Sequence, residues 1–324
     1  MIFKKNLLTF KLFIVLFSIL FAYFLSNIVL LFFENYVDTD LDNYTANLVY
    51  LSDLNRADSG SFFFYYVLSI LSQFLFGSND VEPYVLFHAV AFISTFIVTL
   101  ACTWNIRNLN HFLLLFPLIF MVIMSPKLLD VVASNLRAGL ALGIFLYAVE
   151  LLHGYKKIPI LILSALMHLS MAPLIGLYVL FQIMDKKAFF RTKPKFLLFF
   201  VLVIVTLLGA YTMKIFHPLP LWSNGPLYML SIFLLLIFII ILKKNIVKST
   251  EGYMFIGIML LVLWSFMLDY GAIRFFSYAL PFIILLAVKN PNKTFIYKLI
   301  IGYFPFFILY QYYWLSNSID LNLL

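Results

Sequence analysis

Apolar runs long enough to cross a lipid bilayer follow one another along almost all of this 324-residue chain. A helix needs roughly 20 predominantly apolar residues to cross about 30 Å of hydrocarbon. Hydrophobic residues make up 64% of the sequence and charged residues only 11%, and the mean hydropathy is +1.04. The sequence lacks the short segments of alternating polarity that form membrane barrels. We therefore expect an all-α, polytopic membrane protein that forms a single integral membrane domain over residues 1–324.

Two segments need an interpretation of their own before the crossings can be counted. Residues 61–77 are too short to cross, and the polar atoms of Tyr65, Ser69, Ser72 and Gln73 share one helical face, which predicts an amphipathic helix on the membrane surface. Residues 159–182 have lysines beyond both ends, so we expect a break between residues 170 and 173 that separates two short helices. Eleven membrane helices are then predicted, near residues 7–33, 84–103, 111–124, 137–152, 155–171, 172–184, 196–216, 227–242, 253–269, 273–289 and 295–315.

Positive charges fall almost entirely on one side of this predicted topology. Seventeen of the 22 Lys and Arg residues lie on one side, and eleven of the 14 Asp and Glu residues lie on the other. Because cytoplasmic loops carry an excess of Lys and Arg, we expect a cytoplasmic amino terminus, an acidic outer surface and an outer loop over residues 34–83. The net charge of +8 then favours anionic membrane lipid as a partner and does not indicate nucleic acid. The basic residues left on the outer side are Arg56, Lys127, Arg137, Lys214 and Arg274.

Three polar residues are predicted at the outer ends of membrane helices. Arg137 opens a helix whose next turns contain Gly139 and Gly143, small residues that let another helix or a ligand approach the backbone closely. Arg274 begins a later helix at the same level, and His168 lies just below the predicted break. The alternative for the arginines is a snorkelling anchor, and the alternative for His168 is a hydrogen-bonded core histidine.

The first outer loop supplies charge of the opposite sign. Asp38, Asp40 and Asp42 occupy alternate positions and Tyr44 follows them, a pattern that fits a carboxylate and an aromatic ring handling sugar hydroxyls. A solvated acidic loop is the alternative. The twelve-residue calcium loop is not matched, because neither its central glycine nor its final glutamate is present. Asp269 precedes Arg274 by five residues, so it is a candidate partner for that arginine.

The order of these features resembles the EpsG/Wzy family of bacterial surface polysaccharide polymerases. The resemblance rests on D-x-x-x-Y from Asp40 to Tyr44, on YYVLSILSQFLFG, on N-L-R-x-G-L-A from Asn135, and on K-K followed by A-L-M-H-L-S ahead of a proline. It covers most of the first 185 residues and, through DYGAIRFFSY, part of the last third. The segment order is also similar to that of the wider GT-C-type membrane glycosyltransferases. Ala138 stands where many relatives have glutamine.

The resemblance implies a glycosyltransferase in the bacterial inner membrane that joins lipid-linked oligosaccharide repeat units on the outer face. Its donor and acceptor would be undecaprenyl-diphosphate-linked glycans, and a chain-length regulator protein is a further candidate partner. Arg137 and Arg274 would bind the diphosphate, His168 would be a third ligand or a proton shuttle, and Asp40 would handle the acceptor hydroxyl. No cofactor is expected, although magnesium at the aspartate cluster of the first outer loop stays open. Further candidates for substrate contacts are Asp38, Asp42, Tyr44, Arg56, Lys127, Asp269 and Tyr270.

Other function classes fit parts of the same pattern. A glycosyltransferase that adds single sugars from a polyprenyl-phosphate donor would also need a phosphate-binding arginine. A flippase for lipid-linked oligosaccharides would place cations at several levels through the bilayer, whereas the predicted membrane interiors contain almost no arginine. A secondary transporter would show an internal repeat or paired broken helices, and a membrane scaffold would need none of these polar residues.

Overall fold

The structure is a computed structural model, and it describes residues 2–33, 62–77, 83–186, 195–216, 250–268 and 274–318. These residues are all-α, with twelve α-helices, one π-helix and one 3₁₀ turn. Contacts divide the chain into two compact units. Unit 1 contains Met1–Asn108 and Leu129–Ala172, and unit 2 contains Leu109–Leu128 and Pro173–Leu324.

Four helices of the described part are long and apolar enough to cross a membrane. They are found at Leu8–Asn27, Val85–Thr103, Thr250–Met267 and Lys293–Tyr312. A fifth crossing results if Leu109–Ile123 and Pro126–Val132, which meet at a bend of 66°, form one broken span. The chain is thus a multi-pass membrane protein with four or five candidate spans in its described part, which correspond to five of the eleven that the sequence predicts.

Several of the other predicted crossings are shorter than the hydrocarbon layer. Helix α7 (Leu136–Leu151) has 16 residues and α8 (Lys157–Met167) has 11, which correspond to about 24 Å and about 17 Å of helix. The predicted crossing at 227–242 lies outside the described residues. The described part thus shows four or five candidate spans, and the count of eleven stays a prediction.

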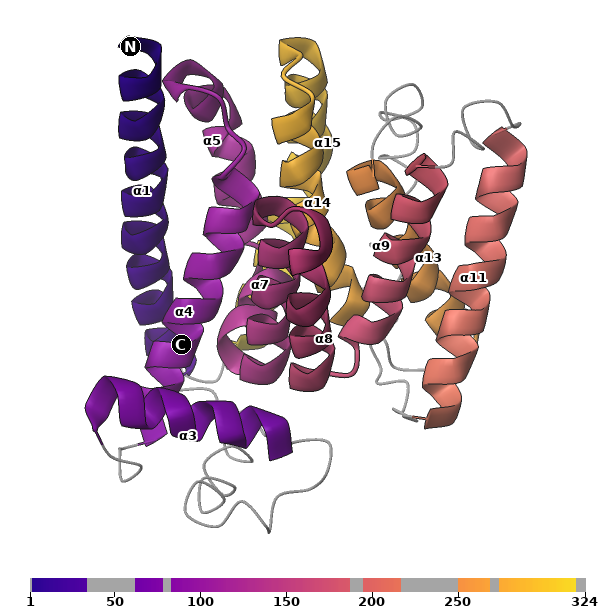
Figure 1. Ribbon diagram of the computed structural model, residues 1–324, viewed down its shortest axis with the longest axis horizontal. Helices are drawn as coiled ribbons and strands as arrows, with labels where there is room; N and C mark the ends of the chain where they lie inside the picture. Colours follow the sequence, from indigo (N-terminus) through magenta and orange to yellow (C-terminus); the bar gives the residue numbers. More distant parts are fainter. Residues whose placement is uncertain are drawn as a thin grey trace. The chain divides into compact units, whose positions relative to one another are not determined.

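Unit 1 is built on an antiparallel pair, α1 (Ile2–Phe33) and α4 (Pro83–Thr103), drawn in indigo and purple in Figure 1. At one end, the Lys11 ammonium donates to the Trp104 carbonyl and lies 4.4 Å from the centroid of the same residue's ring. At the other end, Ser26 Oγ lies 3.4 Å from His88 Nε2. These polar contacts fix the register of two helices whose remaining contacts are mostly apolar.

Helix α7 packs against α4 through small residues. A Cβ added to Gly143 would lie 3.3 Å from Ile97 Cβ, so a larger residue would push the two helices apart. Gly139 is closer still to its neighbour, the π-helix η3 (Asp130–Ser134), because an added Cβ would lie 2.5 Å from the Val131 carbonyl oxygen. The glycines thus set the depth at which the start of α7 is packed.

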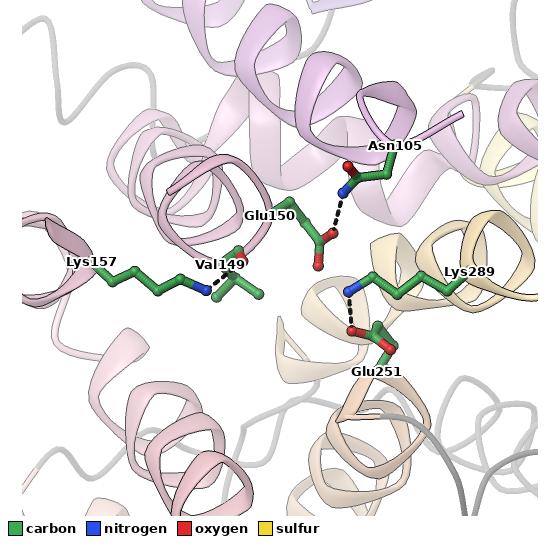
Figure 2. Close-up of polar contacts among 6 residues, drawn as sticks. All are labelled: Asn105, Val149, Glu150, Lys157, Glu251 and Lys289. Atoms are coloured by element: carbon green, nitrogen blue, oxygen red, sulfur yellow. Dashed lines mark hydrogen bonds and ion pairs between the residues drawn. The ribbon is translucent and has the colours of Figure 1, made fainter. Parts of the chain in front are cut away.

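Helix α8 runs back along α7. The two helices are joined by η4 (Gly154–Lys156), and Ser164 Oγ donates to the Ala141 carbonyl at 2.8 Å. At the joined end, Lys157 Nζ donates to the Val149 carbonyl at 2.9 Å, as Figure 2 shows. The amino terminus of α7 and the carboxyl terminus of α8 therefore lie at the same end of the pair.

Helix α3 (Phe62–Phe76) runs crosswise to α1 and α4 and packs on α8 (Figure 1). Its orientation fits the predicted surface helix, but the four predicted polar residues are divided, since Gln73 is exposed and Ser69 is partly buried. Tyr65 and Ser72 are buried against the protein, whereas Tyr66, Ile70 and Phe74 are exposed, with Phe74 83% accessible. The side chains spaced one turn apart on the outer face are thus apolar, as expected where that face meets lipid and not water.

Unit 2 contains α5 (Leu109–Ile123), α11 (Lys195–Phe216), α13 (Thr250–Met267), α14 (Arg274–Lys289) and α15 (Lys293–Ser318), together with α9 (Met171–Lys186), which begins at the unit boundary. Helices α13 and α14 are antiparallel and are tied by an ion pair between Glu251 and Lys289 (Figure 2). Helices α11 and α13 lie side by side, and Lys214 Nζ donates to the Leu268 carbonyl at 2.6 Å. The two basic residues stabilise opposite ends of this packed layer.

The predicted break within 159–182 is present, and it lies a few residues earlier than expected. Helix α8 ends at Met167 and α9 begins at Met171. Pro173 does not cause the break, because it occupies the first turn of α9, where a missing N–H leaves no intrahelical bond unmade. The turn is formed instead by residues 168–170, through a bond from Met171 N to the His168 carbonyl at 3.0 Å.

Replacing Gly139 by alanine tests the packing of α7 on η3. The new methyl would meet the backbone of Val131 and Val132, which cannot rotate away as a side chain can. We therefore expect the free energy of unfolding to fall by about 1–3 kcal/mol or more, and the thermal unfolding midpoint in detergent to fall with it. Gly176→Ala is the matched control, since its Cβ would have nothing within 4 Å and alanine favours the helix by about 0.5–1 kcal/mol. Equal midpoints for the two variants would contradict the close approach.

Candidate functional site

Arg137 lies in the first turn of α7, directly after the π-helix. Asn135 is the N-cap residue, and its side-chain oxygen accepts from Ala138 N at 3.4 Å. The Asn135 N–H donates back to the Asp130 carbonyl at 2.9 Å, which closes the wide turn of η3. A helix amino terminus carries partial positive charge, so it disfavours a guanidinium and favours an anion. The position of Arg137 is therefore electrostatically unfavourable unless something negative lies beside it.

The Nε atom of Arg137 is buried and has no hydrogen-bond acceptor among the described residues. The rest of the side chain is only partly buried. A guanidinium keeps its charge at any physiological pH and offers five N–H donors in a plane. Leaving a buried donor without a partner costs about 1–3 kcal/mol, and more for a charged group. Only Nε is buried without an acceptor and the residue as a whole is partly exposed, so a ligand that reached the guanidinium would supply the acceptor that Nε lacks among the described residues.

His168 lies at the same end of the α7 and α8 pair as Arg137. The hydrogen bond between Ser164 and Ala141 joins the two antiparallel helices. Arg137 lies four residues before Ala141 and His168 lies four residues after Ser164, so both lie about 6 Å from this bond in the same direction. Two of the sequence-predicted residues are thus brought to one end of one unit.

The His168 ring takes part in the turn that follows α8. Its Nδ1 accepts from Ser170 N at 3.2 Å and lies 2.6 Å from Ser170 Oγ. The histidine backbone is extended, with φ −154° and ψ 119°, and its N–H donates to the Ser164 carbonyl at 3.2 Å. Sequence reasoning noted the H-x-S spacing but did not identify Ser170 as a site residue.

The remaining predicted residues lie in unit 2 or outside the described residues. Arg274 begins α14 in unit 2, and Lys127 lies partly buried on α6 (Pro126–Leu129). The other candidates lie outside the described residues, and their roles stay predictions: Asp38, Asp40, Asp42, Tyr44, Arg56, Asp269 and Tyr270.

A second polar cluster lies at the opposite end of α7 and was not predicted. Glu150 is buried, and one carboxylate oxygen accepts from Asn105 Nδ2 at 2.9 Å (Figure 2). Asn105 follows α4, so this bond ties the carboxyl ends of α4 and α7, beside the bond from Lys157 to the Val149 carbonyl. Because these donors and acceptors are paired with one another, we interpret the cluster as structural.

No group of three or more His, Cys, Asp or Glu side chains in the described ranges is arranged to hold a metal ion. The aspartates of the first outer loop, which carry the alternative of a magnesium site, lie outside those ranges.

Comparison with known proteins gives no relative for this chain. No protein-family model, no curated protein and no solved structure matches it. The function is therefore inferred from the sequence pattern and from the geometry around Arg137 and His168.

Arg137→Met separates a functional arginine from a structural one by stability alone. Methionine keeps much of the length of the side chain and removes the unpaired buried donor. We therefore expect the free energy of unfolding to stay equal or to rise by up to about 1–3 kcal/mol, and the thermal unfolding midpoint in detergent to stay equal or to rise with it. Arg107→Met is the control, because Arg107 is exposed and surface changes usually alter stability by less than about 0.5 kcal/mol. A clear drop for Arg137→Met alone would assign Arg137 to the fold and not to a ligand.

Proposed function

We propose that this protein is a membrane glycosyltransferase that polymerises undecaprenyl-diphosphate-linked oligosaccharide repeat units on the outer face of the bacterial inner membrane. The observation that carries the proposal is the buried Nε of Arg137, which has no acceptor among the described residues, at the end of α7 where His168 also lies. The N-L-R and H-x-S residues that carry the resemblance to the EpsG/Wzy family are the residues found at this end.

The chemistry of the transfer explains why an arginine is needed. The acceptor hydroxyl attacks the anomeric carbon of the donor, and the bond from that carbon to the diphosphate oxygen breaks, so negative charge builds on the leaving diphosphate. A guanidinium matches phosphate oxygens with two parallel N–H bonds, and in a site shielded from water such donors lower the barrier by several kcal/mol. Arg137 would bind the diphosphate in this way, and Arg274 is the second candidate.

The orientation in the membrane rests on charge. Lys11, Arg107 and Lys157 lie at the ends of α1, α4 and α8 that the positive-inside rule places in the cytoplasm. Arg137 and His168 belong to the opposite ends of α7 and α8, where the lipid-linked repeat unit would be presented after its transfer across the membrane. In this arrangement the acidic first outer loop, with Asp40, would supply the base for the acceptor hydroxyl.

The decisive assay is a product ladder. The purified protein would be placed in nanodiscs with the lipid-linked repeat unit isolated from cells that make it, and products would be separated by size. We expect a ladder of oligomers that differ by one repeat unit. A single added sugar from a polyprenyl-phosphate donor would support the simpler glycosyltransferase, and lipid translocation in liposomes without any product would support a flippase.

Arg137→Lys tests the proposed binding mode. Lysine keeps the positive charge but offers a point charge in place of a planar fork. We therefore expect the rate of ladder formation to fall about 10- to 100-fold, which corresponds to the loss of one charge-assisted hydrogen bond. The unfolding midpoint should stay unchanged. Arg107→Lys should keep the wild-type rate. A rate unchanged by Arg137→Lys would mean that only the charge matters, as it does for an anchor.

A further inference from the structure

The bent junction of α5 and α6 in unit 2 is held by a side chain of α15. Met124 and Ser125 lie between the end of α5 and the start of α6, and the two helices meet there at 66°. Helix α15 packs along α5, and Gln311 Nε2 donates to the Met124 carbonyl at 2.8 Å. A break in an apolar helix frees backbone groups from their intrahelical partners, and this bond pairs one of them.

Two hydroxyl groups lie buried at the same junction. Ser125, in the break, and Tyr303, on α15, are both fully buried, and neither hydroxyl has a hydrogen-bond partner among the described residues. The Ser125 side chain lies within interaction range of the Tyr303 hydroxyl, although the two do not meet in hydrogen-bond geometry. A hydroxyl removed from water costs free energy unless it is hydrogen-bonded, so two neighbouring ones indicate a third polar group that both can reach.

The chemistry of the junction indicates what this group is. Both hydroxyls are neutral, and each can donate one hydrogen bond and accept others. A water molecule has the same properties, and buried waters typically make about three hydrogen bonds to polar groups that are otherwise unsatisfied. The Met124 carbonyl keeps a second lone pair after it accepts from Gln311, so it is a candidate third partner. A calcium or magnesium ion would instead need about six oxygen ligands, several of them usually charged.

We propose that the junction of α5 and α6 is a binding site for one ordered water molecule, which the hydroxyls of Ser125 and Tyr303 share. The water completes the pairing of polar groups that Gln311 begins at the Met124 carbonyl, and so stabilises the bend between the two helices. The site is independent of the proposed function, because it requires no sugar, no diphosphate and no residue of unit 1.

Radiolytic labelling detects the water directly, because X-rays convert a bound water into hydroxyl radicals that oxidise the side chains in contact with it. Full-length protein in nanodiscs would be irradiated briefly, digested and analysed by mass spectrometry. We expect the buried ring of Tyr303 to be oxidised well above Phe255, an equally buried aromatic residue on α13. In Ser125→Ala the water loses one partner, so oxidation of Tyr303 should fall toward the level of Phe255. Equal oxidation of the two rings in the wild type would overturn the proposal, since the hydroxyls would then be dry or bonded directly to each other.

Thermal unfolding in detergent provides a second test with the opposite sign for a dry site. Ser125→Ala and Tyr303→Phe each remove one bond to the water, so we expect each to lower the unfolding midpoint by about 2 °C or more. The double variant should lose less than the sum of the two, because both substitutions act through the same water. Tyr312→Phe is the matched control on α15, since Tyr312 is 73% exposed, and it should keep the wild-type midpoint. A higher midpoint in either single variant would mean that an unpaired hydroxyl had been removed, and the water site would be wrong.

Discussion

The structure depends on one constraint, the need to pair every backbone N–H and C=O group where water is absent. Long helices meet this need internally, and each interruption of a helix leaves groups that must find other partners. Three of the interruptions in the described part illustrate different solutions. Gln311 Nε2 donates to the Met124 carbonyl at 2.8 Å where α5 ends, Asn135 caps α7 after the π-helix, and His168 accepts from Ser170 between α8 and α9. At each of these three places a polar side chain pairs a backbone group near a helix end.

That constraint explains what hydropathy could and could not predict. The spans in α1, α4, α13 and α15 were predicted because a long apolar run specifies a membrane helix by itself. The break after α8 was predicted from the lysines at both ends of its segment, but it was misplaced, since Pro173 fits the first turn of a helix as well as it ends one. Helix α7 has the predicted length of 16 residues, whereas α8, with 11 residues, is shorter than the predicted helix at 155–171.

In the candidate site, too, the sequence predicted which residues matter, and the folded structure determines how they are buried and hydrogen-bonded. Arg137 and His168 were selected from the sequence because charged and polar residues are rare in this chain and these two lie at predicted helix ends. The burial of the Arg137 Nε and the close approach of η3 to Gly139 are features of the folded chain that the local sequence does not specify. The bond from Ser170 to His168 depends on the turn geometry, which only the fold supplies. The sequence therefore identified Arg137 and His168 as residues at helix ends, and the structure supplied the hydrogen bonds around them.

The two ends of α7 differ in how their polar groups are paired. At the carboxyl end, the buried Glu150 carboxylate accepts from Asn105, and Lys157 stabilises the last carbonyls of the helix, so this end is satisfied within the protein. At the amino end, a permanently charged side chain keeps a buried donor without an acceptor in the described residues, beside a helix terminus that already favours negative charge. A purely structural site would gain by replacing that arginine with an apolar residue of similar size. The anionic ligand that we propose would supply the missing acceptor of Arg137, and the planar fork of its guanidinium fits a phosphate with two parallel hydrogen bonds.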